Sequence, residues 1–281
     1  FNLLATVRML VYIEGNIGTG KTTFLNMLNY YLKEFESLDL DARIVLEPVD
    51  EWMDTKDSDG NNILQKFYKN QERYSYIFQM NSFISRVKKI NDEFERDDYK
   101  YVYKNSVEDS VEDSEVIKPE RHNAIEDSWG DMDTDDTDDE MPELESASPK
   151  MEKLLFVERS IYTDKNCFAE NCFESGNMSK LEYDVYCKWN EWLSSEFRVR
   201  PDAYIYLRCF PNVNHDRISK RNREGEENIP LEYLQVLHEK HEKWMAKEKE
   251  TVPILTIDAL LNFKDPEVMA KIAEEIYYFV R

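Results

Sequence analysis

Two kinds of hydrophobic pattern alternate along the chain. Residues 9–13 form a short continuous apolar run, and after Lys21 the apolar positions recur every three or four residues. This change of period predicts a strand, a tight turn and a helix. Further strand-like runs lie at 43–46, 153–157, 203–207 and 253–257, and helical spacing covers 62–95, 181–197, 212–223, 231–248 and 266–279. Strands that alternate with helices indicate an α/β fold, a parallel β-sheet flanked by helices.

One segment interrupts this pattern. Residues 105–150 contain 17 Asp and Glu, three Lys and Arg, and few large apolar residues. Such a segment buries too little apolar surface to offset the entropy of ordering, so we expect a disordered acidic insertion, with helical order fading before it. The chain is therefore predicted to be a single domain over 1–281 that contains 105–150 as an insertion.

Charge and composition narrow the class of protein. The formal net charge is −22, and the 105–150 segment carries −14 of it. Nonspecific nucleic-acid binding needs a cationic surface, so we expect no nucleic-acid partner. The chain has no apolar run of about 18 residues and no secretory signal pattern, from which we expect no membrane association and an intracellular, cytoplasmic protein.

The spacing of cysteine and histidine residues gives no metal or disulfide pattern. The four Cys form no C-x-x-C pair, so neither a disulfide scaffold nor a zinc site is expected. His238 and His241 lie three positions apart in a predicted helix. With no third ligand in view, we expect this pair on a solvated face.

A Gly-rich motif follows the first predicted strand. Residues 15–22 fit G-x-x-x-x-G-K-[ST], and three of the seven Gly fall within six residues there. In this context backbone N–H groups surround phosphate oxygens, Lys21 contacts the β and γ phosphates, and Thr22 ligates Mg²⁺. The motif predicts a nucleotide-binding site but does not identify the reaction. Its candidate ATP-binding residues are Gly15, Asn16, Ile17, Gly18, Thr19, Gly20, Lys21, Thr22 and Thr23.

Charged residues at two strand ends and on one basic helix suit phosphoryl transfer. Glu47 follows the second strand and is a candidate general base, although an acid before Pro is also common in surface turns. Glu158 and Arg159 close the strand after the acidic segment, which suits a Mg²⁺ shell and a phosphate bridge, or a solvated strand end. Three arginines form either a lid over a transferring phosphoryl group or a generic basic face: Arg217, Arg221 and Arg223.

Taken in chain order, these motifs resemble one known family. The stretches that carry the resemblance are 13–18, 47–49, 72–73, 78–79, 85–86, 158–162, 229–234 and 253–256. They resemble the deoxyribonucleoside kinases, in particular the deoxycytidine and deoxyguanosine kinase branch. The resemblance implies a P-loop kinase fold with a helical lid. It also implies a deoxynucleoside kinase of nucleotide salvage, which transfers the γ-phosphoryl group of ATP or another nucleoside triphosphate to the 5′-hydroxyl of a deoxynucleoside.

The resemblance further implies catalytic and donor-site roles. Glu47 is similar to the family's general base on the 5′-hydroxyl, Arg159 to its partner, and Lys21 to the phosphate-binding lysine. Glu158 joins Thr22 in the site of the Mg²⁺ cofactor. The remaining donor-site residues that the resemblance implies are Arg217, Arg221, Arg223, Asn262 and Phe263.

The acceptor site is implied in the same way. Tyr68 and Glu226 match residues that hold the sugar 3′-hydroxyl, and Gln79 matches the side chain that pairs with the base edge. Because an Arg and an Asp near the base accompany cytosine or purine substrates in this family, we expect deoxyguanosine, deoxyadenosine or deoxycytidine to be favoured over thymidine. The other substrate-binding residues implied are Glu47, Trp52, Phe78, Arg86, Arg159, Asp164 and Phe168.

The resemblance also implies a homodimer, and two alternative functions stay open. The dimer contact would lie on helices near 73–96 and 181–197, and Trp189 and Trp192 are expected in the core or in such an interface. A nucleoside monophosphate kinase would share the loop and lid, but Glu47 and Glu226 are electrostatically poor neighbours for a second phosphate. A catalytically idle nucleotide-binding scaffold that uses its acidic insertion as an interaction arm is the other alternative.

Overall fold

The computed structural model describes residues 8–36, 40–111, 152–226 and 229–281. The chain divides into two units, one made of Phe1–Phe94 with Lys150–Arg281 and the other of Glu95–Pro149. All the site residues considered below belong to the first unit. The acidic segment falls in the second, and most of it lies outside the described residues, so its predicted disorder stays a prediction.

The described strands form a parallel five-stranded sheet in the order β2-β3-β1-β4-β5. This arrangement confirms the predicted α/β class. The second strand starts three residues before the predicted 43–46 run, because its first residues pair with the start of β3. The bounds are β1 Arg8–Glu14, β2 Leu40–Val45, β3 Glu152–Glu158, β4 Ala203–Arg208 and β5 Ile254–Asp258.

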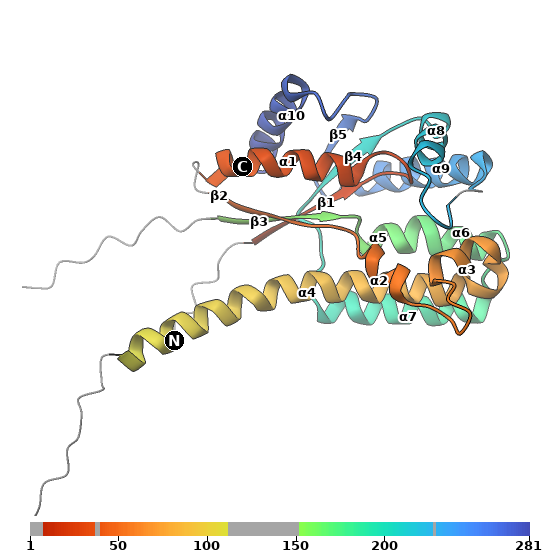
Figure 1. Ribbon diagram of the computed structural model, residues 1–281, viewed down its shortest axis with the longest axis horizontal. Coiled ribbons are helices and arrows are strands. Elements are labelled where there is room, and N and C mark those ends of the chain that lie inside the picture. Colours follow the sequence, from red (N-terminus) through yellow and green to blue (C-terminus); the bar gives the residue numbers. More distant parts are fainter. Residues whose placement is uncertain (1–7, 37–39, 112–151, 227–228) are drawn as a thin grey trace, which may run out of the picture. The chain divides into compact units, whose positions relative to one another are not determined.

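Helices cover both faces of this sheet (Figure 1). The helices α1 (Lys21–Glu36) and α10 (Pro266–Phe279) lie on one face of the sheet. On the other face lie α7 (Lys180–Glu196) and the part of α4 (Gln71–Val111) up to Phe94. The remaining described helices are α2 Val49–Asp54, α3 Ile63–Lys69, α5 Ile161–Thr163, the π-helix η1 Asp164–Ala169, α6 Glu170–Glu174, α8 Pro211–Arg221 and α9 Leu231–Glu248.

The central strand β1 separates two apolar cores. Because side chains alternate between the faces of a strand, Val11 and Ile13 pack with Phe24 of α1 in one core. Tyr12 points to the opposite face and belongs to the core that contains Phe83 of α4 and Tyr186, Trp244 and their neighbours. Burying the strand on both faces explains its continuous apolar run. Parallel pairing of β1 and β2 with β3 brings the carboxyl ends of the three strands to the same edge of the sheet.

Two helix boundaries differ from the predicted ones. The predicted helix over 62–95 is broken at Asn70, which ends α3 with non-helical backbone angles and accepts a hydrogen bond from N of Arg73 at 3.1 Å. Asn is well suited to capping both helices at once. The expectation that helical order fades before residue 105 is wrong, since α4 continues to Val111. No Gly or Pro interrupts the sequence between Gln71 and Val111.

Two expectations about the basic and histidine-bearing helices also need correction. The basic helix ends at Arg221 rather than at 223, because Asn222 adopts the left-handed conformation with φ of +49°. His241 is fully buried rather than solvated, and its Nδ1 lies 2.6 Å from O of Leu237. Among the described residues no group of three or more His, Cys, Asp or Glu is arranged to hold a metal ion.

Candidate active site

The Gly-rich loop joins β1 to α1 at the carboxyl edge of the sheet. Gly18 has φ of +80°, and a Cβ at this position would lie 2.6 Å from O of Asn214 at the start of α8. Asn16 ties the loop to α9, because its Nδ2 donates to O of Leu234 at 2.8 Å while its Oδ1 accepts from N of Ile17. The loop is therefore packed between two helices and held in shape by backbone contacts.

Lys21 is buried at the end of this loop. Its Nζ donates to O of Gly15 at 3.0 Å and to O of Asn16 at 2.9 Å. Burial, and then the positive charge of Arg159, lower the pKa of Lys21 to about 7. A polyanionic ligand in the loop would favour the charged form of this lysine.

Thr22 and Glu158 bring two oxygen donors together beside the loop. The hydroxyl of Thr22 donates to Oε1 of Glu158 at 2.7 Å, and Oε2 of Glu158 accepts from N of Glu47 at 3.4 Å. A hydroxyl and a carboxylate are the hard ligands that Mg²⁺ prefers, and Mg²⁺ in such sites takes few protein ligands because phosphates and water supply the rest. The donor set therefore fits the expected cofactor.

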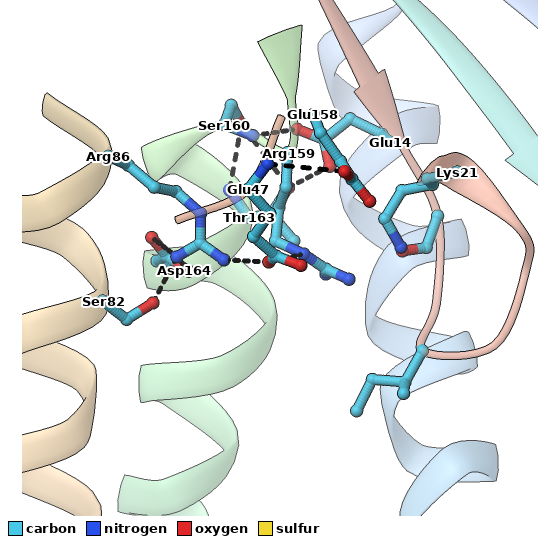
Figure 2. Close-up of polar contacts among 12 residues, drawn as sticks. Glu14, Lys21, Glu47, Ser82, Arg86, Glu158, Arg159, Ser160, Thr163 and Asp164 are labelled. Atoms are coloured by element: carbon cyan, nitrogen blue, oxygen red, sulfur yellow. Dashed lines mark hydrogen bonds and ion pairs between the residues drawn. The ribbon is translucent and has the colours of Figure 1, made fainter. Parts of the chain in front are cut away.

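Glu47 lies at the centre of a group that we call the acceptor-side charge cluster: Glu47, Arg86, Arg159 and Asp164. One carboxylate oxygen of Glu47 accepts from Nη2 of Arg86 and from Nε of Arg159, the latter at 3.1 Å (Figure 2). Burial acts to raise the pKa of Glu47, but the guanidinium groups of Arg86 and Arg159 outweigh it and lower the pKa to about 2. Glu47 is therefore ionised at neutral pH.

The same arginine reaches the second carboxylate of the cluster. Nη1 of Arg86 lies 2.6 Å from both carboxylate oxygens of Asp164 and also donates to the hydroxyl of Ser82. Burial raises the pKa of Asp164 to about 6 although Arg86 lowers it. The Arg86 guanidinium also lies 4.9 Å from the ring of Trp52. Arg86 thus links the two carboxylates of the cluster.

Arg159 has an uncommon backbone conformation. Its φ is +64°, in the left-handed region that residues with a Cβ seldom adopt. The guanidinium lies 4.7 Å from the ring of Phe168. Its Nη1 is buried and has no hydrogen-bond partner within the described part of the chain, which suits a ligand that carries negative charge.

The predicted lid arginines have different partners. Arg217 donates to O of Thr19 at 3.2 Å and to O of Ala259 at 2.8 Å, so it joins the loop to the segment after β5. Arg221 and Arg223 instead make ion pairs with Glu226. The structure therefore does not aim all three guanidinium groups at one point.

A continuous cavity of about 710 Å³ connects the loop, the charge cluster and the three arginines predicted to form a lid. Of the predicted site residues, Gly15 and Asn16 do not line it, because they support the loop from behind through the contacts of Lys21 and α9. Sequence reasoning missed several lining residues: Leu64, Phe67, Leu260, Leu261 and Lys264. The first two lie in a stretch of helical spacing, whereas no periodic pattern marks the other three. The predicted residues that line it are Ile17, Gly18, Thr19, Gly20, Lys21, Thr22, Thr23, Glu47, Trp52, Tyr68, Phe78, Gln79, Arg86, Glu158, Arg159, Asp164, Phe168, Arg217, Arg221, Arg223, Glu226, Asn262 and Phe263.

Comparison with known proteins agrees with this arrangement. A family profile described as "Deoxynucleoside kinase" matches residues 11–116 and 135–281. The chain belongs to the deoxynucleoside kinase family. It is 32% identical over 279 residues to deoxycytidine kinase of Rattus norvegicus, which covers 92% of this chain and 86% of the rat protein. Identity to the Homo sapiens deoxycytidine kinase is 30%, with coverage of 91% and 85%.

A relative with a different printed substrate is also similar. Mitochondrial thymidine kinase 2 of Homo sapiens is 27% identical over 255 residues, which cover 90% of this chain and 71% of that protein. Membership of the deoxynucleoside kinase family makes this chain a kinase with nucleoside and nucleotide substrates and a nucleoside triphosphate donor. The idle-scaffold alternative is therefore not retained. Within the described residues, no helix is long and apolar enough to cross a bilayer.

Proposed function

We propose that this deoxynucleoside kinase transfers the γ-phosphoryl group of ATP, or of another nucleoside triphosphate, to the 5′-hydroxyl of a deoxynucleoside in salvage inside the cell. The observation that carries this proposal is a chain of contacts. The hydroxyl of Thr22 in the phosphate-binding loop donates a hydrogen bond to Glu158, and the second carboxylate oxygen of Glu158 accepts one from N of Glu47. All three residues line the cavity described above. A nucleophile held by Glu47 would thus lie beside a phosphate held by the loop.

Catalysis in this proposal is positioning combined with neutralisation of charge. Glu47 accepts the proton of the 5′-hydroxyl. Arg159, which already contacts Glu47, offers to the transferring group its Nη1, which has no hydrogen-bond partner among the described residues. Lys21 contributes a positive charge to the phosphates. Thr22 and Glu158 would hold Mg²⁺, which supplies charge neutralisation at the phosphate oxygens when bound.

The acceptor would lie between the charge cluster and a group of aromatic side chains. Phe67 stacks on Phe78 with ring centroids 4.6 Å apart, Trp52 meets Phe78 edge-on at 5.5 Å, and Gln79 beside them is almost fully buried. A buried amide next to flat rings suits a base that needs both stacking and an edge to pair with. Tyr68 and Glu226, which line the same cavity, are the proposed partners of the sugar hydroxyl.

We place deoxyguanosine, deoxyadenosine and deoxycytidine above thymidine. The support is the buried ion pair of Arg86 and Asp164, which lines the cavity together with Ser82. A 5-methyl group against this pair would occupy space near charged atoms without satisfying any of them, which is unfavourable.

A homodimer is part of the proposal. Ile77 and Ile84 on α4 and Trp189 and Trp192 on α7 are exposed, with Trp192 at 51%. The two helices pack together through Phe83 and Tyr186, whose ring centroids are 5.9 Å apart. Large apolar side chains gathered on neighbouring helices are typical of an interface between subunits.

The proposed reaction is tested by incubating the purified chain with γ-labelled ATP and Mg²⁺. Each of the four deoxynucleosides and each of the corresponding monophosphates is supplied separately as acceptor. We expect label in deoxynucleoside monophosphates, with thymidine the poorest nucleoside acceptor. Label in diphosphates alone would favour the monophosphate kinase alternative, and size measurement by light scattering tests the dimer in the same preparation.

A further inference from the structure

A buried carboxylate beside the phosphate-binding loop has no role in the proposal above. Glu14 is the last residue of β1, and its side chain is fully buried. Burial raises the pKa of Glu14. Because removing a carboxylate from water costs free energy that its hydrogen bonds must offset, the partners of Glu14 indicate what it serves to hold.

The two oxygens of Glu14 hold both ends of one short turn. Oε1 accepts from N of Ser160 at 2.9 Å, and Oε2 accepts from the hydroxyl of Thr163 (Figure 2). Within the turn, N of Thr163 donates to Oγ of Ser160 at 3.2 Å, so that Ser160 caps α5. Both donors to Glu14 are neutral. Its contacts therefore organise a backbone N–H and a hydroxyl and are not an ion pair.

The residues on either side of this turn belong to the acceptor-side charge cluster. Arg159 immediately precedes Ser160, and Asp164 immediately follows Thr163. Arg159 has its left-handed backbone, and its N donates to O of Ile13 at 3.0 Å. The consecutive N–H groups of Arg159 and Ser160 are thus bound to two consecutive residues of β1, which keeps Arg159 in a conformation it would otherwise leave.

We propose that Glu14 is a positioning residue for phosphoryl transfer. Through its hydrogen bonds to Ser160 and Thr163, it fixes the positions of the two cluster residues that flank the turn. Arg159 is thereby held in contact with Glu47, and Asp164 in contact with Arg86. This proposal rests on the function proposed above. Nε of Arg159 lies 3.1 Å from Oε1 of Glu47, a contact that a shift of the turn would break. A misplacement of about 1 Å in such a site costs on the order of 100-fold in rate.

The test uses two pairs of variants, each with one member that keeps the hydrogen bonds. Glu14→Ala removes both contacts, whereas Glu14→Gln keeps an oxygen for N of Ser160 and an N–H for the Thr163 hydroxyl. Thr163→Val removes the hydroxyl and Thr163→Ser keeps it. We expect kcat to fall about 10- to 100-fold in Glu14→Ala and about 10-fold in Thr163→Val, with KM for ATP within threefold. The Gln and Ser variants should recover most of the loss.

Controls separate positioning from loss of stability. Met269→Ala empties a fully buried position on α10 in the other core, so it should lower the melting temperature while kcat of the folded enzyme stays within twofold. In Glu14→Ala combined with Thr163→Val, the two losses should not multiply, because Thr163→Val removes a contact that Glu14→Ala has already removed.

The results distinguish failure of the proposed function from failure of the positioning role of Glu14. If wild-type enzyme phosphorylates no deoxynucleoside, the proposed function and the role of Glu14 both fail. If wild-type turnover is normal and the folded Glu14→Ala enzyme keeps kcat within twofold, or the Gln and Ser variants lose as much as their partners, the positioning role alone is overturned. A Glu14→Ala chain that does not fold leaves the decision to the Gln, Val and Ser variants, whose side chains match the originals closely in size.

Discussion

The phosphate-binding loop comes from eight consecutive residues, whereas the acceptor-side charge cluster draws on three separate parts of the chain. In the loop, the backbone N–H groups and the buried Lys21 have no anionic partner until a phosphate-bearing ligand binds, among the residues that the structure describes. In the cluster, Glu47 and Asp164 already share the guanidinium of Arg86, and Arg159 completes the group. The loop therefore depends on its ligand for negative charge, whereas the cluster already contains paired positive and negative side chains.

This difference in charge pairing predicts how the loop and the cluster respond to substitutions. The loop depends on the shape of its backbone, so we expect an added side chain at Gly18 to be harmful. The cluster depends on mutual pairing of buried charges, and removing one member leaves its partner buried and unpaired. Four predictions test this contrast.

The largest effect is expected for Glu47→Gln. The amide keeps the size of the side chain but cannot accept a proton, so kcat should fall about 100-fold or more, the scale of general-base loss. Steady-state kinetics with the best deoxynucleoside measures it. Glu51→Gln, the same change at an exposed position on α2, is the control and should stay within twofold. Turnover near wild type in Glu47→Gln would remove Glu47 from the mechanism.

A change of specificity is expected when Arg86→Met and Asp164→Ala are combined. Removing the ion pair opens the wall of the cavity, so the ratio of kcat/KM for thymidine to that for deoxycytidine should rise about 10-fold or more, the scale of a one-group change in a pocket. The ratio is the proper measure because Arg86 also contacts Glu47, and a loss common to both substrates cancels. An unchanged ratio would contradict the specificity argument.

A smaller effect, on stability, is expected for Gly18→Ala. The new Cβ would combine a left-handed backbone with a 2.6 Å approach to O of Asn214, so the loop and α8 must separate. Gly176→Ala is the matched control, since its φ is +77° and no other atom of the described residues lies within 4 Å of the added Cβ. Denaturant unfolding should show a loss of about 1–2 kcal/mol in the control and more at Gly18. Equal losses of stability in Gly18→Ala and Gly176→Ala would show that the positive φ, and not the contact with Asn214, determines the effect.

The smallest effect is a proton linked to nucleotide binding. The pKa of Lys21 is lowered to about 7, so this lysine is mostly neutral at pH 8, and a triphosphate should restore its charge by taking up about one proton. Affinity for the triphosphate should therefore weaken as pH rises above 7. Calorimetry at pH 8 in two buffers of different ionisation enthalpy measures the uptake. Lys21→Met should show none, and identical binding enthalpies for the wild type would contradict the assignment.

Some site residues were predicted from local patterns in the sequence, whereas most of the acceptor-site residues came only from the family resemblance. The loop motif, the strand before it and the helix after it are contiguous, and each has its own period or spacing. Glu47 and Arg159 were found because they follow strand-like runs that end at one edge of a parallel sheet. Leu260, Leu261 and Lys264 had no such signal, because a loop after a strand shows no period.

By itself, the sequence determined the alternation of strands and helices, the phosphate-binding loop and the family, because these are properties of neighbouring residues and of their order. Only the tertiary structure decided which charges pair. Arg86 is 39 residues from Glu47 and 78 from Asp164, yet one guanidinium binds both. The same holds for Glu14, whose two partners lie 146 and 149 residues away. Such pairings depend on how the sheet brings distant strand ends together, and burial then gives each contact its strength.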